Sequence, residues 1–197
     1  AAPLHAARLA LKPITGQGPM PDVVAYQIDL SIDLVPGRYQ LRASASSTKL
    51  GKGGSVYLSL DVPDFSAVPI ALSGLAIGYA DGARLPIAPA DPAAGVPAHP
   101  LPFGPSLDRQ FASTDGLKIY FEVARLNAAD AATVTVTVAD QSDRSVVSAD
   151  YPLAPNASGR MLLTQSLASL PPGAYRLRVT ATSGPNAATR EVGFVVR

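Results

Sequence analysis

Two segments of the sequence, far apart along the chain, are closely similar. Residues 34–45 read LVPGRYQLRASA, and residues 170–181 read LPPGAYRLRVTA. Because proline presets φ and glycine accepts positive φ, the Pro-Gly pair of each copy predicts a type II turn. Behind each turn apolar and polar residues alternate, which is the pattern of a half-buried strand. A turn and strand that occur twice predict two related β-sandwich units. The turn positions concerned are Pro36, Gly37 and Tyr39 in the first copy and Pro172, Gly173 and Tyr175 in the second.

The same period-two alternation continues along the chain, and no stretch has sustained helical periodicity. Residues 23–34 are the longest example, since every even-numbered residue there is apolar. The predicted fold is therefore all-β, with two immunoglobulin-like or fibronectin-III-like sandwich units. The predicted strands are residues 8–12, 23–34, 38–46, 55–62, 70–79, 117–124, 133–139, 145–151, 160–167, 174–182 and 190–197.

Pro63 interrupts the strand pattern and places the predicted domain boundary, with one unit over residues 1–66 and a second over residues 67–197. The second unit has the seven strands that a complete sandwich needs, whereas the first has about four. The proline-rich residues 86–105 predict a stiff, extended loop outside the core. An apolar sheet face must be buried against something, so the incomplete first unit predicts a protein partner. That partner is either a second copy of the chain or an upstream domain that completes the sandwich.

Composition excludes several classes of function. Lys and Arg total 16 against 15 Asp and Glu, without a basic run, so no nucleic-acid partner is predicted. The absence of cysteine excludes disulfides, thiolate metal sites and cysteine nucleophiles. The longest apolar stretch, residues 68–80, is too short to span a membrane.

Candidate catalytic and metal-binding residues are few. His5 and His99 are the only histidines, and neither lies beside a nucleophile-elbow pattern, so we predict no catalytic residues and no enzyme activity. Two close aspartate pairs are explained by turn formation, with calcium binding as the alternative. Neither pair has the spacing of a calcium loop, and no metal or cofactor is predicted. The pairs are Asp61 with Asp64 and Asp140 with Asp143.

The tyrosines offer two interpretations. Tyr39 and Tyr175 follow Pro-Gly, where a tyrosine forms a corner by bonding its hydroxyl to upstream backbone; an exposed ligand-stacking ring is the alternative. Tyr57 and Tyr120 point outward by their place in the alternation and are candidates for stacking against a sugar. Polysaccharide binding therefore stays open as a weak alternative.

A succession of short motifs resembles a known family. These motifs are Pro36–Arg42, Gly54-Ser-Val-Tyr57, Leu60-Asp-Val-Pro-Asp-Phe-Ser66, Leu72-Ser-Gly-Leu75, Arg109-Gln-Phe111, Leu117 to Val123 and the closing segment from Pro172-Gly-Ala-Tyr-Arg-Leu-Arg178 to Val196. Their order over residues 23–197 resembles the C-terminal β-sandwich region of large bacterial proteins that carry a von Willebrand factor A domain. The resemblance implies an extracytoplasmic location, secreted or at the cell surface, and accessory modules. No Asp-x-Ser-x-Ser motif is present, so the metal-dependent adhesion of an A domain is not implied.

We therefore expect a non-enzymatic, extracytoplasmic structural or interaction protein that acts through strand edges and apolar faces. It would be either a piece of a larger surface protein or a subunit of a surface assembly or filament. In the filament case the strand containing Leu9 and Leu11 would insert into a neighbour's incomplete sandwich. The alternative is a carbohydrate-binding accessory module of a larger secreted protein.

Overall fold

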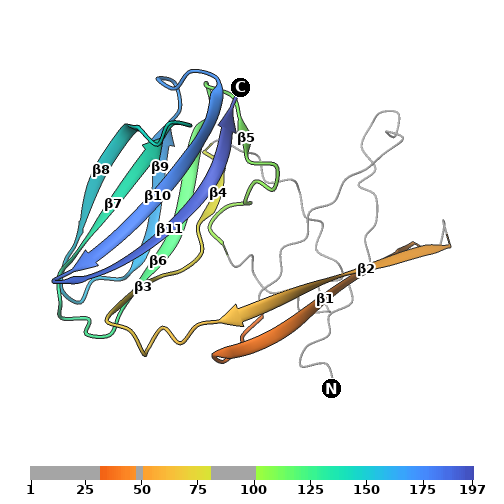
Figure 1. The fold of residues 1–197 in the computed structure, drawn as a ribbon, viewed down its shortest axis with the longest axis horizontal. Coiled ribbons are helices and arrows are strands. Elements are labelled where there is room, and N and C mark those ends of the chain that lie inside the picture. Colours follow the sequence, from red (N-terminus) through yellow and green to blue (C-terminus); the bar gives the residue numbers. More distant parts are fainter. Residues whose placement is uncertain (1–31, 48–50, 81–100) are drawn as a thin grey trace.

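The computed structural model describes residues 32–47, 51–80 and 101–197. Within these ranges the chain is all-β: every regular element is a strand, and none is a helix. Two parts are present. The first is a two-stranded hairpin of β1 (Gly37–Ser47) and β2 (Lys52–Val62), and the second is a β-sandwich that starts at residue 70. Figure 1 shows the hairpin beside the sandwich, and no strand pairing joins the two.

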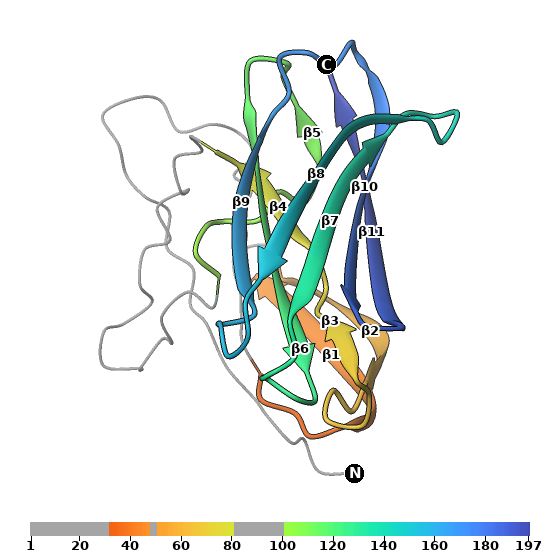
Figure 2. The same ribbon diagram turned by 90° about the vertical axis from the view of Figure 1, so that its left-hand side faces the viewer.

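The sandwich consists of two sheets that face each other, as Figure 2 shows. One sheet has the order β5-β11-β10-β7-β8. In the other, β6 pairs with β3 and β4 on one edge and with β9 on the other edge. All pairings are antiparallel except that of β5 with β11. The strands are β3 (Ile70–Leu72), β4 (Ala76–Tyr79), β5 (Gln110–Phe111), β6 (Gly116–Arg125), β7 (Ala132–Ala139), β8 (Ser145–Leu153), β9 (Arg160–Ser166), β10 (Gly173–Ser183) and β11 (Asn186–Val196).

The core lies between the two sheets and is built from alternate residues of the strands. On β10, Leu177, Val179 and Ala181 are completely buried. Across the core, β6 contributes Leu117 and Phe121, which are equally inaccessible. Burying an aliphatic or aromatic side chain of this size stabilises a fold by about 1.5–3 kcal/mol, so this layer holds the two sheets together. No buried polar or charged residue is present in the described part of the chain.

The predicted strand over residues 70–79 is wrong as a single strand, because the structure divides it into β3 and β4. The division occurs at Ser73. The Ser73 amide donates to the Glu122 carbonyl oxygen at 3.0 Å, and the Glu122 amide donates to Ser73 Oγ at 2.9 Å. A side-chain hydroxyl thus replaces a backbone acceptor, which breaks the ladder while both backbone groups of β6 stay bonded.

β5 was not predicted as a strand. It has two residues, which is too few for alternation to be visible in the sequence. It is held on the sheet by the amides of Val195 and Arg197, which donate to the carbonyl oxygens of Arg109 and Phe111 at 2.9 and 2.8 Å. Together with the division of residues 70–79, β5 raises the seven strands expected after residue 67 to nine.

The described end of the proline-rich segment packs on β4. Phe103 is only 5% exposed, and a Cβ at Gly78 would lie 2.8 Å from its ring, so the ring packs directly on the β4 backbone. The Ser106 amide donates to the Ile77 carbonyl oxygen at 2.8 Å. Residues 101–105 lie in a loop and contribute one buried side chain, which packs on β4 and is not part of the core cluster between the two sheets. Residues 86–100 lie outside the described ranges.

In the first unit, the predicted strands 38–46 and 55–62 correspond to β1 and β2. Of the predicted strand 23–34 only residues 32–34 are described, and they are not in a strand. The predicted strand 8–12, with Leu9 and Leu11, lies outside the described residues. A connection over residues 63–69 joins β2 to β3, and in it Asp64 Oδ1 accepts from the Ser66 amide at 2.9 Å.

Candidate interaction surface on the β1–β2 hairpin

The hairpin β1–β2 has the same strand register as the hairpin β10–β11. In the first, Gly37 lies opposite Val62 and Ser47 opposite Lys52; in the second, Gly173 lies opposite Val196 and Ser183 opposite Asn186. Each residue of one hairpin therefore has a counterpart in the other. The tips differ, since the β10–β11 turn has only the two residues Gly184 and Pro185. Gly184 has a φ of +55°, as the first position of a type II′ turn requires.

Both hairpins begin with a tyrosine corner. The Tyr39 hydroxyl donates to the Val35 carbonyl oxygen at 2.8 Å, and the Tyr175 hydroxyl donates to the Pro171 carbonyl oxygen at 2.7 Å. In a type II turn each of these carbonyls would instead accept from the backbone amide three residues on.

The predicted type II turns are therefore wrong. Gly37 has a φ of +155° rather than about +80°, and Gly173 has no positive φ. The tyrosine hydroxyl takes the place of the turn's own hydrogen bond at both sites. Pro36 and Pro172 lead into a bend and not into a closed turn.

The two hairpins differ most on their apolar faces. In β10–β11, Leu177, Val192 and Phe194 are 0%, 8% and 2% exposed. Their counterparts in β1–β2 are Leu41, Leu58 and Leu60, which are 39%, 59% and 37% exposed. Alternation correctly places these leucines on one face, but the expectation that the face is turned into a core is not met in the described structure. We call Leu41, Val56, Leu58 and Leu60 the apolar hairpin face.

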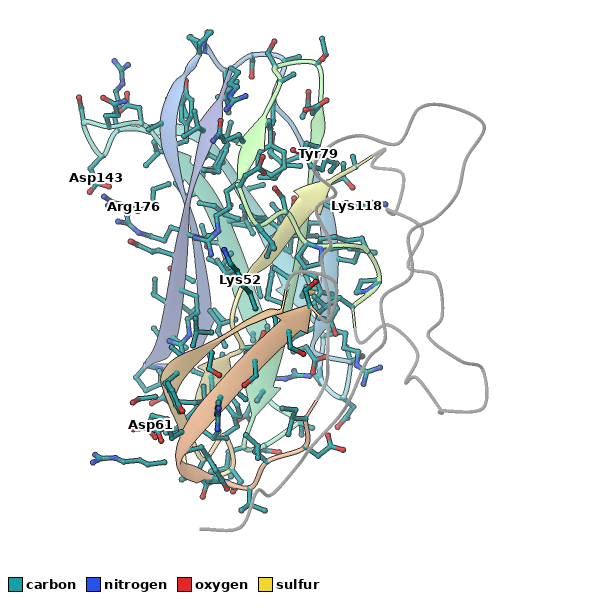
Figure 3. All side chains as sticks on the ribbon, turned by 90° about the vertical axis from the view of Figure 1, so that its right-hand side faces the viewer. Lys52, Asp61, Tyr79, Lys118, Asp143 and Arg176 are labelled. Atoms are coloured by element: carbon teal, nitrogen blue, oxygen red, sulfur yellow. The ribbon has the colours of Figure 1, made fainter. Side chains whose placement is uncertain are left out.

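The opposite face of the β1–β2 hairpin is polar. The Arg42 guanidinium lies 5.5 Å from the centre of the Tyr57 ring and donates to Ser55 Oγ at 3.2 Å. Near the base of the hairpin, Arg38 pairs with Asp61 at 3.6 Å. Figure 3 shows Lys52 and Asp61 near opposite ends of this hairpin. One apolar and one polar face are typical of a sheet that covers a core on one side only.

The corresponding polar face of β10–β11 is richer in ion pairs. Arg178, the counterpart of Arg42, contacts the carboxylates of Glu191 and Asp143. The hydrogen bond to Glu191, followed by the charges of Glu191 and Asp143, raises the pKa of Arg178. Arg176 pairs with the same Asp143 at 3.2 Å, and Figure 3 shows these two side chains together. In the β1–β2 hairpin the counterpart of Glu191 is Tyr57, so that carboxylate is replaced by an aromatic ring.

Of the four aspartates considered for calcium, Asp64, Asp140 and Asp143 lie in turns, whereas Asp61 lies in β2 and pairs with Arg38. Asp140 Oδ1 accepts from the amides of Ser142 and Arg144 at 2.9 and 3.1 Å, while its Oδ2 pairs with the Arg144 guanidinium. The backbone hydrogen bond from Arg144 is the main cause of the lowered pKa of Asp140. In the ranges that the structure describes, no three His, Asp or Glu side chains gather in a way that could hold a metal ion.

The two outward tyrosines lie on separate parts of the molecule. Tyr57 is on β2 and is 60% exposed, with the Arg42 guanidinium over its ring. Tyr120 is on β6, and its hydroxyl donates to the Glu122 carboxylate, which raises the pKa of Tyr120. The two rings therefore do not belong to one common sheet. His5 and His99 lie outside the described residues.

A hollow of about 400 Å³ lies at one end of the five-stranded sheet. Two of its hydroxyl groups are bonded to backbone: Thr182 Oγ1 donates to the Thr133 carbonyl oxygen and Ser183 Oγ to that of Ala131. No acid, base or activated nucleophile lines it. Its lining residues are Ala131, Ala132, Thr133, Pro152, Leu153, Ala154, Thr182, Ser183 and Gly184.

No known protein-family model matches the sequence, and no curated protein is similar to it. Among solved structures, latent dimeric PorU from Porphyromonas gingivalis is 13% identical with a TM-score of 0.42, over 83% of this chain and 12% of that one. The β-glucuronidase of Parabacteroides merdae is 17% identical with a TM-score of 0.40, over 74% of this chain and 15% of that one. The chain thus spans a small fraction of each protein's length. Along the described segments, no helix has the length and apolarity needed to cross a membrane.

Proposed function

We propose that this chain is a non-enzymatic structural or interaction protein. The sandwich of β3 to β11 is the scaffold, and the apolar hairpin face is the surface that contacts another polypeptide. The observation that carries the proposal is the contrast between Leu41, 39% exposed, and its completely buried counterpart Leu177. The two hairpins have the same register and the same alternation of apolar and polar residues, so both are suited to cover a core with one face. In the described structure only β10–β11 does so.

The energetics support a covering partner. An isolated two-stranded hairpin is at best marginally stable in water, and β1–β2 pairs with no other described strand. Its apolar face exposes Val56 at 68% and Leu58 at 59%. Clustered apolar side chains on a surface mark an interaction site, because covering them removes an unfavourable contact with water.

The non-enzymatic part of the proposal is supported by how the polar side chains are used. Glu122 is bound by Tyr120 and Arg160, and Asp143 is bound by Arg176 and Arg178. These two carboxylates form ion pairs and a hydrogen bond on the outer faces of the sheets. None of them lines the hollow described above.

The proposal includes an extracytoplasmic location, at a cell surface or in a secreted assembly. Its support is the resemblance of residues 23–197 to the C-terminal region of von Willebrand factor A-domain proteins.

Light scattering of residues 1–197 over a concentration series tests the contact surface. We expect the mass to rise above the 20.2 kDa of one chain as concentration increases, and we expect the paired substitution Leu41→Asp and Leu58→Asp to abolish the rise. The matched control is Leu107→Asp with Leu126→Asp, since both leucines are exposed outside the hairpin. Equal loss of association in the control pair would contradict the proposal, and a mass that stays at one chain throughout would exclude a second copy of the chain as the partner.

A further inference from the structure

We propose that the partner makes its contact by adding a strand to β1, and that this strand is followed by an acidic turn. The inference rests on the proposed function and specifies the kind of partner. The added strand runs antiparallel to β1 beside residues 40–46, with apolar side chains at alternate positions.

The sandwich itself provides the template, because β10 pairs with a second strand on the edge away from β11. That strand is β7, which runs antiparallel to β10 from Arg176 to Thr182. Val138, Val136 and Val134 of β7 lie opposite Leu177, Val179 and Ala181. The counterparts of these three β10 residues are Leu41, Ala43 and Ala45 of β1. An apolar residue opposite each of them would extend the hairpin into a three-stranded sheet.

The edge of β1 away from β2 has no partner among the described strands, since β1 and β2 form a two-stranded sheet. Such an edge presents backbone donors and acceptors that pair readily with an added strand. The small side chains of Ala43 and Ala45 leave room beside them for branched side chains on the added strand. Backbone pairing therefore favours an added strand at this edge, and the apolar side chains of that strand would extend the apolar hairpin face beside Leu41.

Charge complementarity specifies the residues that follow the added strand. Arg178 is neutralised by two carboxylates, Glu191 from β11 and Asp143 from the turn after β7. Its counterpart Arg42 is described in contact with Ser55 and the Tyr57 ring, neither of which is an acid. A carboxylate in the turn after the added strand would take the place that Asp143 has beside Arg178.

A peptide with the sequence of residues 132–144, which comprise β7 and the turn with Asp143, is the probe for this contact. The absence of cysteine from the chain allows the register to be mapped by disulfide formation. Ser44 is the counterpart of Thr180, which lies opposite Thr135. Directly opposed residues of an antiparallel pair are close enough for a disulfide. We therefore expect Ser44→Cys in the full chain to cross-link to a peptide carrying Thr135→Cys.

The matched control is Ser59→Cys, which lies on the same polar face but on β2. We expect it not to cross-link. A peptide with Val134→Lys and Val136→Lys should lose binding in fluorescence anisotropy. Replacing Asp143 of the peptide by Asn, or using Arg42→Gln in the chain, should weaken binding by about two- to fivefold, as for an exposed ion pair.

The outcomes separate this inference from the proposed function. If Leu41→Asp with Leu58→Asp abolishes association of the chain while the peptide neither binds nor cross-links, the contact surface stands and strand addition is wrong. Cross-linking at Ser59→Cys equal to that at Ser44→Cys also overturns strand addition to β1. If cross-linking is selective for Ser44→Cys and the peptide also prevents the chain from associating with itself, the added strand comes from a second copy of the chain. The same selective cross-linking without this effect of the peptide supports a separate protein donor.

Discussion

The hairpins β1–β2 and β10–β11 are the same local structure in two different environments. Both pair eleven residues with eleven in the same register, and both begin with a tyrosine whose hydroxyl bonds to the carbonyl four residues upstream. Only β10–β11 lies within a five-stranded sheet and against a second sheet. The comparison shows that register and corner are local properties of these segments, whereas burial depends on what lies opposite.

The largest expected difference between the hairpins concerns the paired leucines. Leu177→Ala should lower the free energy of unfolding of the sandwich by about 2–5 kcal/mol, because it removes a fully buried side chain and leaves a cavity. Leu41→Ala should change it by less than about 0.5 kcal/mol, because Leu41 is exposed and lies outside the sandwich. Urea unfolding followed by far-ultraviolet circular dichroism measures both values. Equal losses at a concentration where light scattering gives the mass of one chain would mean that the apolar hairpin face is covered within the chain itself.

A smaller difference is expected for the tyrosine corners. Tyr175→Phe removes the donor to the Pro171 carbonyl and should lower the free energy of unfolding by about 0.5–1.5 kcal/mol. The ring contact with Phe194 is kept, so the measured loss isolates the hydrogen bond. Tyr39→Phe removes the matching bond in β1–β2 and should leave the unfolding of the sandwich unchanged. A loss at Tyr39 as large as that at Tyr175 would show that both hairpins unfold in one cooperative step.

The smallest expected effect concerns pH. In the folded chain the pKa of Asp140 lies below its ordinary value of 3.8, chiefly because the Arg144 amide donates to its carboxylate. A lowered pKa stabilises the fold above pH 3.8, and this contribution is lost as pH falls through the folded pKa. In the Asp140→Asn variant, the free energy of unfolding of the sandwich should therefore fall less steeply as the pH is lowered. Urea unfolding between about pH 5 and pH 2 measures this dependence.

Asp64 is the control for that experiment. Its pKa is also lowered, chiefly by the Ser66 hydroxyl, but it lies in the connection between the hairpin and the sandwich. Asp64→Asn should leave the pH dependence of the sandwich as it is in the unsubstituted chain. An equally reduced steepness in both variants would mean that the connection and the sandwich unfold together.

Much of the fold could be predicted from alternation, and the exceptions have physical reasons. The strands from β6 to β11 lie close to their predicted ranges, because each is long enough for its period of two to be visible. β5 is too short for that. The break between β3 and β4 depends on a hydrogen bond that the amide of Glu122, a residue far along the chain, donates to Ser73 Oγ. The burial of Phe103 depends on Gly78, which leaves space for its ring at a contact that local patterning does not encode.

The candidate surface was predictable in part. Alternation placed Leu41, Leu58 and Leu60 on one face, and the strand count predicts that this unit is incomplete. The turn type at Pro36 and Gly37 was wrong, because the hydroxyl of Tyr39 competes for the carbonyl that would close the turn. The role that we propose for Arg42 depends on a comparison with Arg178, whose two acidic partners come from β11 and from the turn after β7.

The sequence by itself determined the all-β class, the strand that occurs twice behind a Pro-Gly pair and the side chains that share a face, because these depend on spacing along the chain. The tertiary structure decided which of the two faces is buried. Leu177 and Leu41 follow the same local pattern, but a core forms only where a second sheet supplies apolar side chains across it, as β6 does for β10. Whether a side chain is buried depends on a distant segment that packs against it, whereas the alternation of apolar and polar residues describes a single strand.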